Sequence, residues 1–504
     1  MDIMKLTPIQ LDRFLHVQSI VGRQEADAAK VRDLRAYYDG DHPVMLTQRQ
    51  QEFLGPLLTG TEWTFAHNLV KSVIDTLRER LSVNGFTVNG QSPDDVDGET
   101  ANPDGDAAGL FWDWWTQNRM DAQQVRLYRR AMRDGASFVM VDFDPTAQRP
   151  RLTLHSVDDG TVGVTYHRDP GDPNVIMFAN RYWYTFDPLT PGETGVLRKT
   201  TYLPGEIRKY RQDSKATNGW SPVMDDEDGN AWPIPWKDSS GQPLGVALVE
   251  FQNPGGSEVT QIIGLQNALN KAWLDLIAAA DAQGFPVMAI EYADATGGSL
   301  VDDDDIEGSD EFQIAPGRAI EMFGAHLNRI PGADLTSMMA VIDQLTSAIS
   351  GVSRVPSYYL RPVGGGEVPS GEALKQLESG LVKRAEERQL VFGQAWEDVF
   401  TLAAKLAATF GGTDVPGPMT IEIVWEDPNV RNELSEAQTA QLHAGMGVPD
   451  AAIWRRLGYS PDEIAEFRDD ARLQRAQDVA SIASAVRAEQ VRNAPQTNPA
   501  SGGA

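Results

Sequence analysis

The stretch RPVGGGEVPSGEALKQ, residues 361–376, joins three glycines to the first residues of a long helical pattern. A loop that cradles nucleotide phosphates follows the pattern G-x-x-x-x-G-K-[ST], in which the lysine reaches the terminal phosphates. Gly366 and Gly371 have this separation, but Glu372 and Ala373 follow in place of the lysine and the hydroxyl residue. This excludes a nucleotide loop. We interpret the stretch as a loop that shifts, because glycine adopts many backbone conformations at little cost.

The residues after this loop predict one very long helix. Ser370 is suited to cap its N-terminus, and Glu372 lies in the first turn, where a negative charge is favourable. The helical pattern runs from residue 370 to about 410, and roughly forty residues at 1.5 Å each give ~60 Å, longer than a small domain is wide. We expect kinks at Gly380 and Gly393.

Two further amphipathic helices, over residues 257–282 and 334–350, precede the loop, and Ser257 is suited to cap the first. Between them lie the strand patterns FPVMAIEY and FQIAPGRAIEM, separated by a run of carboxylates that includes Asp302, Asp303, Asp304 and Asp305. Such a run could bind magnesium for nucleic-acid cleavage, but catalytic carboxylates usually come from separated positions on rigid elements. We therefore expect a solvated or partner-facing surface.

The N-terminal half predicts helices first and strands later. Helical patterns cover residues 11–39, the stretch NLVKSVIDTLRERLSVNGF and the stretch LFWDWWTQNRMDAQQVRLYRRAMRDG, whose tryptophans are expected to pack in a core. Residues 94–106 are expected to form a surface loop. Short alternating runs then predict an antiparallel region over residues 137–250. Its basic residues are expected to face solvent: Arg198, Lys199, Arg208, Lys209 and Arg211.

Composition narrows the class of protein. The 504 residues are 41% hydrophobic and 23% charged, as in globular chains, and contain no cysteine, which excludes disulfides and thiolate metal sites. The seven histidines form no H-E-x-x-H motif, and the nearest pairing, Asp41 with His42, lies in a turn-like stretch that we expect to be solvated. No apolar run reaches the length of a membrane span, and the N-terminus lacks the order of a signal peptide, so we expect synthesis in the cytosol and no metal or other cofactor.

A formal charge of −28 argues against a basic face that grips nucleic acid. It does not exclude a protein that surrounds DNA without holding it, since an acidic wall repels a polyanion. A single subunit would also have difficulty burying the apolar faces of so many long helices around one core. Copies in a closed ring would bury them against their neighbours, with the glycine loop at the inner edge.

The order of several stretches resembles a known family. They are YYDGDHP, NLVKSVIDTLRERLSVNGF, RAMRDGASFVMVDFD, NPGGSEV, AISGVSRVPSYYL and PSGEALKQLESGLVKRAEERQ. Together they cover nearly the whole chain and resemble the portal proteins of tailed double-stranded DNA bacteriophages, in the branch of long-tailed phages with actinobacterial hosts.

This resemblance implies an α+β portal fold that forms a ring, with a mainly helical wing, a two-helix stem, a small α/β clip and a helical crown. The implied divisions are wing 1–253 (N-terminal helices and β-rich part), first stem helix 254–284, clip 285–333, second stem helix 334–352, tunnel loop and long wing helix with its strand 353–431, crown 432–490 and disordered tail 491–504.

The resemblance also implies which residues meet partners. A tunnel loop facing DNA would contain Arg361, Val363, Gly364, Gly365, Gly366, Glu367 and Val368. The clip surface facing terminase or an adaptor would contain Asp302, Asp303, Asp304, Asp305 and Glu307. Lys375, Lys383, Arg384 and Arg388 on the long helix could approach phosphate, but i,i+4 pairing with the neighbouring glutamates explains them adequately.

The implied role is mechanical, and no catalytic residue is expected. A homo-dodecamer at one capsid vertex of the virion, assembled in the host cytoplasm, would conduct double-stranded DNA inward and outward without reading its sequence. Its partners would be the terminase large subunit, the major capsid and scaffold proteins and a head-completion adaptor, with no membrane. Two alternatives stay open: a metal-dependent α+β enzyme acting on nucleic acid through Asp302–Asp305, and a structural or scaffold protein other than a portal.

Overall fold

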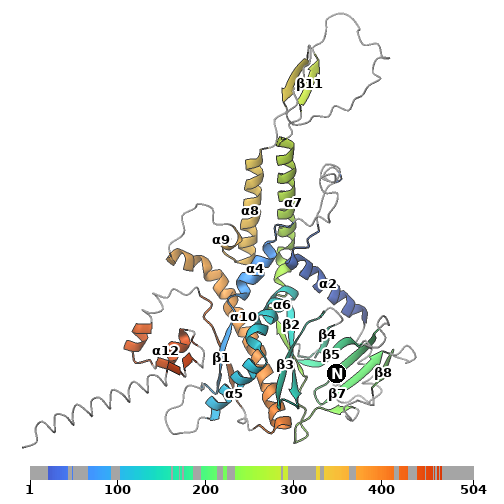
Figure 1. Ribbon diagram of the computed structural model, residues 1–504, viewed down its shortest axis with the longest axis vertical. Coiled ribbons are helices and arrows are strands. Elements are labelled where there is room, and N and C mark those ends of the chain that lie inside the picture. The colour runs from blue at the N-terminus through green and yellow to red at the C-terminus, as the bar shows by residue number, and fades with distance from the viewer. Residues whose placement is uncertain are drawn as a thin grey trace, which may run out of the picture.

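The computed structural model describes residues 21–43, 48, 66–91, 103–159, 163–169, 171–172, 175–185, 195–212, 219–223, 233–284, 288–292, 325–329, 334–361, 371–413, 419–429, 440–448, 450–457, 459, 463–464 and 466–467. They form a broad body from which two long helices project (Figure 1). Helices and antiparallel sheets are combined, which confirms the α+β class.

Helices make up one side of the body and its centre. They are α2 (Val21–Asp39), α4 (Leu69–Arg78), α5 (Pro103–Gln117), α6 (Met120–Asp134), α9 (Ser357–Leu360), α10 (Gly371–Leu406) with its π-helical turn η2 (Ala407–Gly411), and α12 (Asp450–Arg456). The prediction of a surface loop over residues 94–106 was wrong at its C-terminal end, because α5 begins at Pro103. Proline is well tolerated in the first helical turn.

Strands form three antiparallel sheets in the body. A two-stranded sheet pairs β1 (Val83–Val88) with β13 (Ile421–Trp425). The helix predicted over NLVKSVIDTLRERLSVNGF was therefore wrong at its end, since α4 stops at Arg78 and the last residues of this stretch lie in β1. A three-stranded sheet has the order β10-β2-β3, with β2 at Ala136–Asp144, β3 at Arg149–His155 and β10 at Leu248–Gln252. The largest sheet runs β4 (Val164–Arg168), β5 (Ile176–Thr185), β6 (Val196–Tyr202), β7 (Glu206–Gln212) and β8 (Trp220–Pro222), and β9 (Ile234–Pro235) also pairs with β7. This confirms the predicted antiparallel region.

The main core is built around α10, and aromatic rings supply much of its volume. Trp396 is fully buried, lies edge-on to Trp115 with ring centroids 4.8 Å apart, and donates from its indole nitrogen to the Tyr128 hydroxyl at 2.8 Å. Tyr128 stacks on Phe392 at 5.3 Å. The tryptophans of α5 therefore pack as expected, and α10 is the element around which the body is assembled.

Two basic residues of the large sheet do not face solvent as expected. Lys199 is fully buried in β6, and its ammonium lies 4.8 Å from the ring centroids of both Tyr210 and Trp220. Arg208 is also buried and forms an ion pair with Glu206 at 2.6 Å. Aromatic faces attract a desolvated cation, which explains how an interior strand position holds a lysine.

In the turn after α2, Asp41 is exposed as expected, whereas His42 is buried rather than solvated. His42 is 3% exposed; its Nε2 is 2.7 Å from the Tyr37 carbonyl oxygen and its Nδ1 is 2.8 Å from the Asn270 amide nitrogen. Gln266 on the same helix, α7 (Glu258–Gly284), accepts from the Leu69 amide at 3.0 Å. These bonds fix the lower part of α7 to the body, and burial lowers the pKa of His42, which favours its neutral form.

Candidate subunit interface and channel segment

The two projecting helices are α7 and α8 (Leu335–Ser353), which lie side by side as an antiparallel pair (Figure 1). At its 27 residues, α7 is about 40 Å long. Beyond the pair, strand β11 (Met288–Tyr292) pairs with β12 (Ala325–Arg329). The first of these strands was predicted. The second predicted strand, FQIAPGRAIEM, lies outside the described residues, and its place as partner is taken by β12, which the sequence reasoning missed.

Both helices start where the sequence predicts. The Ser257 hydroxyl accepts from the Val259 amide at 3.2 Å and donates to the Arg133 carbonyl of α6, so the capping residue also joins α7 to the body. Asp334 caps α8 by accepting from the Thr336 amide at 3.0 Å. α8 continues three residues beyond the predicted end at Ser350.

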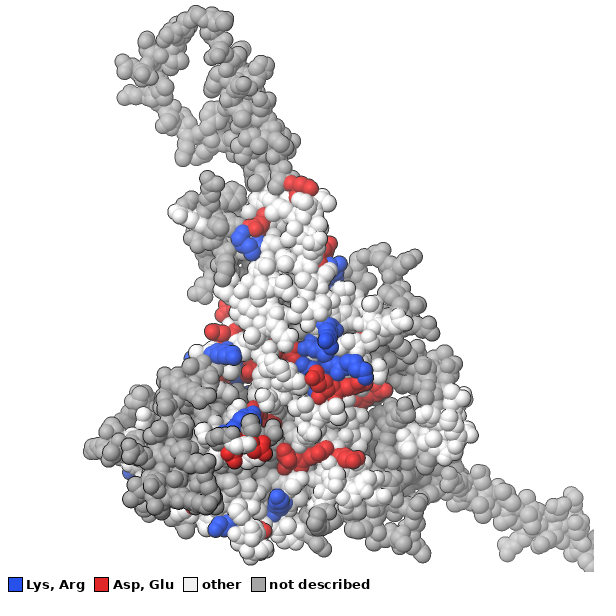
Figure 2. All heavy atoms as spheres, turned by 180° about the vertical axis from the view of Figure 1, so that it is seen from behind, with Lys and Arg blue, Asp and Glu red and all other residues white. Residues whose placement is uncertain are grey.

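The projecting part of this helix pair, residues 271–279 of α7 with all of α8, is called the shaft below. Asp343 is the one charged residue of α8. Met339, Val341 and Val352 expose 57%, 50% and 47% of their surface, and most side chains at 271–279 are only half-buried. Figure 2 shows the shaft as a mostly uncharged surface, in contrast to the clustered charges below it. Contiguous apolar surface of this kind marks an interaction site.

The exposed apolar side chains of α8 lie on two opposite flanks. At 3.6 residues per turn, Val341 and Val352 are about three turns apart and share one flank, whereas Met339 is rotated by about 200° from Val341. Between these flanks the exposed arc carries Asp343 and Ser347. A helix with two apolar flanks and a polar strip between them can contact a neighbour on each side.

Below the shaft lies a buried ionic cluster, called the root, formed by Asn253, Glu258, Arg384 and Arg388. The Glu258 carboxylate accepts from the guanidiniums of both arginines of α10, one on each oxygen. Arg384 also donates to the Ser353 carbonyl at the end of α8, and Arg388 to the Asn253 side-chain oxygen at 3.1 Å. The root thus joins the start of α7 and the end of α8 to α10.

The charges of the root are almost completely removed from solvent, since side-chain exposure is 2% for Glu258, 9% for Arg384 and 3% for Arg388. Burial alone would raise the pKa of Glu258, but the two guanidiniums outweigh it and hold that pKa below its ordinary value. Burial lowers the pKa of Arg388, and Glu258 opposes this. The root is therefore an ion cluster that depends on each of its members.

The predicted DNA-facing residues are only partly within the described chain. Arg361 follows α9 and donates to the Asp343 carbonyl oxygen at 2.6 Å and to the Ser347 hydroxyl at 2.8 Å, so it lies against the polar strip of α8. The other members of that set lie outside the described residues: Val363, Gly364, Gly365, Gly366, Glu367 and Val368. The clip set also lies outside them: Asp302, Asp303, Asp304, Asp305 and Glu307.

The basic residues of α10 divide into two groups. Lys383 is exposed and pairs with Glu386 at 2.6 Å, three residues on, as local pairing predicts. Arg384 and Arg388 were expected to be explained by i,i+4 pairing within their own helix, and this was wrong, since both are directed to Glu258 of α7. Within α10, Arg388 contacts only the adjacent Glu387, at 3.4 Å, among the ion pairs of the described residues. The sequence carries no signal for a partner more than a hundred residues away. The side chain of Lys375 lies outside the described residues. The kinks expected at Gly380 and Gly393 stay predictions; a Cβ at either position would make an ordinary van der Waals contact, 3.5 Å from Arg354 and 3.4 Å from Trp425.

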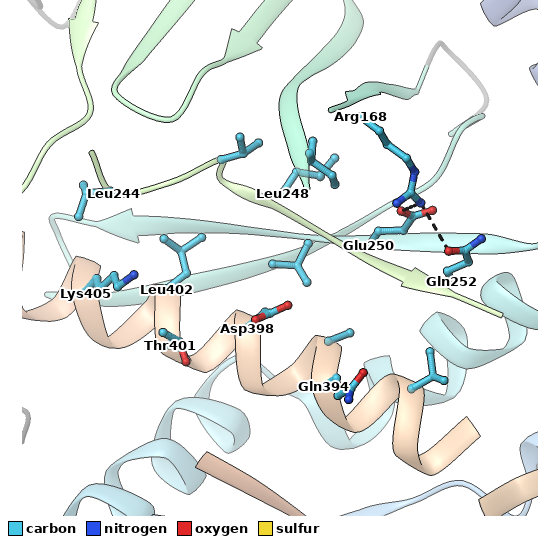
Figure 3. Close-up of a pocket in the computed structure, with 15 residues that line it drawn as sticks. Arg168, Leu244, Leu248, Glu250, Gln252, Gln394, Asp398, Thr401, Leu402 and Lys405 are labelled. Atoms are coloured by element: carbon cyan, nitrogen blue, oxygen red, sulfur yellow. Dashed lines mark hydrogen bonds and ion pairs between the residues drawn. The ribbon is translucent and has the colours of Figure 1, made fainter. Parts of the chain in front are cut away.

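A groove of about 430 Å³ lies between β10 and α10 (Figure 3). Arg168 forms an ion pair with Glu250, which also accepts from the Tyr166 hydroxyl at 3.1 Å, while Asp398 and Lys405 line the helix side. Burial raises the pKa of Glu250 in spite of Arg168.

The described part of the chain has no group of three His, Asp or Glu side chains arranged to hold a metal ion. None of the helices described there combines the length and the apolar character that a membrane span needs.

Comparison with known proteins gives matches over most of the chain. Residues 18–474 match the family described as "Phage portal protein, SPP1 Gp6-like". The portal proteins of Mycobacterium phages D29 and L5 are each 24% identical, over 406 and 422 residues, and each match covers 78% of this chain and 76% of the relative. Among solved structures, an HK97 family phage portal protein from Corynebacterium diphtheriae is 10% identical, with 76% of this chain and 97% of that chain covered and a TM-score of 0.30.

Proposed function

The chain belongs to the SPP1 Gp6-like family of phage portal proteins, and we propose that copies of it form a closed ring through which double-stranded DNA enters and leaves the phage head. Family membership identifies a component of the phage particle and a structural protein rather than an enzyme. The metal-dependent enzyme acting through Asp302–Asp305 is therefore set aside, as is a scaffold protein other than a portal.

The shaft carries the ring proposal. Its helix α8 exposes apolar side chains on two opposite flanks, whereas most of the large aromatic side chains of the body lie in a buried core. A ring built from one repeated contact joins one flank of each subunit to the other flank of the next, which is a heterologous closed interface. Each Met339 would then face a neighbour on one side, and Val341 and Val352 the neighbour on the other.

The polar strip of α8 supports the channel proposal. In such a ring the strip between the two flanks faces away from both neighbours, and Arg361 lies on it through its bonds to Asp343 and Ser347. We assign Arg361 and residues 363–368 to the inner edge of the ring, as the tunnel loop. With a net charge of −28 per chain, the ring would repel DNA weakly and allow it to slide.

The other divisions and partners follow from the same arrangement. Residues 254–284 and 334–352 would be the stem, and residues 285–333, beyond the shaft, the clip, with Asp302–Asp305 and Glu307 as contacts for the terminase large subunit or an adaptor. Residues 1–253 and the long helix would form the wing, and residues 432–490 the crown. Capsid and scaffold proteins would contact the outside of the ring, which would assemble as a dodecamer in the host cytoplasm.

Negative-stain imaging of the purified protein tests the ring. We expect particles much larger than one subunit, with a central hole. A single-subunit species at every protein concentration, with or without the capsid and scaffold proteins present, would contradict the proposal.

A deletion of residues 364–366 tests the tunnel-loop assignment. We expect rings to form as in the unmodified protein, while packaging or retention of DNA in the assembled particle falls. If the deletion abolishes ring formation, the glycine stretch is a structural strut and the assignment is wrong.

A further inference from the structure

A second polar cluster, with one buried carboxylate at its centre, lies between α9 and α10 and has no part in the root. Glu378, on the second turn of α10, is 5% exposed. Its Oε1 atom accepts from the hydroxyls of both Tyr358 and Tyr359, the latter at 3.0 Å. One carboxylate oxygen of α10 thus holds two consecutive side chains of α9.

Arg80 completes this cluster from the body of the subunit. Its guanidinium is 3.5 Å from Glu378 Oε1, donates to the Tyr359 hydroxyl at 2.8 Å and donates to the Pro428 carbonyl at 3.0 Å. Arg80 follows α4, and Pro428 follows β13. The Glu378 carboxylate is therefore tied to two segments of the body as well as to α9, and its position is fixed from several directions.

The tyrosine hydroxyls of the cluster are suited to remain donors. Burial raises the pKa of Tyr358 and of Tyr359, and the hydrogen bonds to the Glu378 carboxylate raise them further. Both phenols stay neutral at physiological pH and can donate to the carboxylate, which a phenolate could not do.

Contacts with the end of α8 continue along the same face of α10. A Cβ added to Gly380 would lie at van der Waals distance, 3.5 Å, from the Arg354 Cβ, so this part of α10 lies beside the residue that ends α8. One turn further on, Arg384 reaches the Ser353 carbonyl. At Glu378, Gly380 and Arg384, α10 therefore lies against α9 and the end of α8.

We propose that Glu378 is a positioning residue that fixes the start of α10 against α9, and so sets the separation of the two chain ends between which the channel loop is held. That this loop faces a channel rests on the proposed function. The fixed separation of the two chain ends does not depend on it. Leu360 ends α9 and Gly371 begins α10, and the cluster bonds the two helices within one or two turns of these ends.

The separation can be measured directly because the chain has no cysteine. Ser357→Cys and Gln376→Cys place spin labels on exposed positions of α9 and α10. Labelled full-length chains are diluted with unlabelled ones so that the measured distances are within one subunit. Double electron–electron resonance is then recorded for Glu378→Gln, for Tyr358→Phe with Tyr359→Phe, and for Glu386→Gln as a matched control on the exposed face of α10.

We expect one narrow distance distribution in the otherwise unmodified protein and in Glu386→Gln, and a distribution at least twice as broad in Glu378→Gln and in the tyrosine pair. If the cluster only stabilised the fold, its variants would have a lower melting temperature, and the distance distribution of the folded protein would be unchanged. An unchanged distribution in both cluster variants would overturn the proposal.

DNA retention by particles carrying Glu378→Gln separates this inference from the proposed function. If rings are intact, the distance distribution is broadened and retained DNA falls several-fold, both the role of Glu378 and the proposed function are supported. A broadened distribution with normal DNA retention overturns the link to the channel and leaves the distance result standing. Absence of rings in the unmodified protein contradicts the proposed function, while the distances still test Glu378.

Discussion

The root and the shaft belong to the same pair of helices but are built in opposite ways. In the root, four polar side chains from α10 and from the start of α7 are buried and satisfy one another within one subunit. In the shaft, one charged residue stands on α8 and large apolar side chains are half-exposed. The difference indicates that one chain alone can hold the helix pair in place, whereas covering its surface requires further copies.

Replacing the apolar flanks of the shaft is expected to have the largest effect. The double variant Met339→Glu with Val341→Glu adds one carboxylate to each flank. In a ring, each of these carboxylates would be buried at an interface without a counter-charge. We expect a folded subunit with an unchanged melting temperature and no ring, measured by size-exclusion chromatography with light scattering. Ala340→Glu, on the polar arc between the two, is the control and should assemble. If both variants assemble alike, the flanks are not the interface.

Removing the carboxylate of the root should damage the subunit itself. Glu258→Gln leaves two buried guanidiniums without their counter-charge, and breaking a buried pair in this way costs about 3–5 kcal/mol. Denaturant unfolding of the isolated subunit measures this loss. Glu386→Gln, in an exposed pair, is the control. A Glu258→Gln variant as stable as the unmodified chain would show that the root does not hold the helix pair.

The root should also give a defined dependence on acid. The pKa of Glu258 in the folded protein lies below its ordinary value of 4.5, so its stabilising effect is fully present above that value and is lost as the pH falls through the folded pKa. The difference in unfolding free energy between the unmodified chain and Glu258→Gln should therefore stay constant from neutral pH to about pH 5 and shrink in stronger acid. A difference that shrinks between pH 7 and pH 5 would contradict this.

Arg361, which lies against the shaft through Asp343 and Ser347, should have a smaller effect. Arg361→Ala removes two hydrogen bonds to α8 from a side chain that is 38% exposed, and we expect a loss of about 1 kcal/mol in unfolding free energy. The same variant should assemble, since the bonds are within the subunit. Loss of the ring would show that Arg361 acts across an interface.

Lys383 should have the smallest effect, because its pair with Glu386 is exposed to solvent and screened by salt. Lys383→Ala is expected to change the unfolding free energy by less than about 0.5 kcal/mol. A loss comparable to that of Glu258→Gln would remove the distinction between exposed and buried ion pairs on α10.

The contrast between root and shaft also explains what the sequence could predict. The apolar periodicity of α7, α8 and α10 is local, so the cap Ser257 and the start of α8 at Asp334 were placed correctly and the ends of these helices nearly so, while the predicted cap Ser370 lies outside the described residues. The glutamate and arginines of the root meet only after folding, and local patterns suggested pairing within α10 instead.

The same limit applies to the sheet and the candidate site. The alternation of apolar and polar residues in β6 does not show which face of the strand is buried. Lys199 lies between aromatic rings that come from two other strands. Of the residues expected to face DNA, Arg361 alone lies in the described chain, where its bonds to α8 could not be foreseen from a loop sequence. The assignments of residues 363–368 and of the clip carboxylates stay predictions.

The most direct test of the central claim is a cryo-electron microscopy map of the assembled protein at a resolution that shows side chains. The account predicts a closed ring in which Met339 of each subunit packs against one neighbour and Val341 and Val352 against the other, with all three nearly buried, while the Glu258 cluster stays within the subunit. A map in which these three side chains remain as exposed as in the single chain, with subunits joined elsewhere, would contradict it.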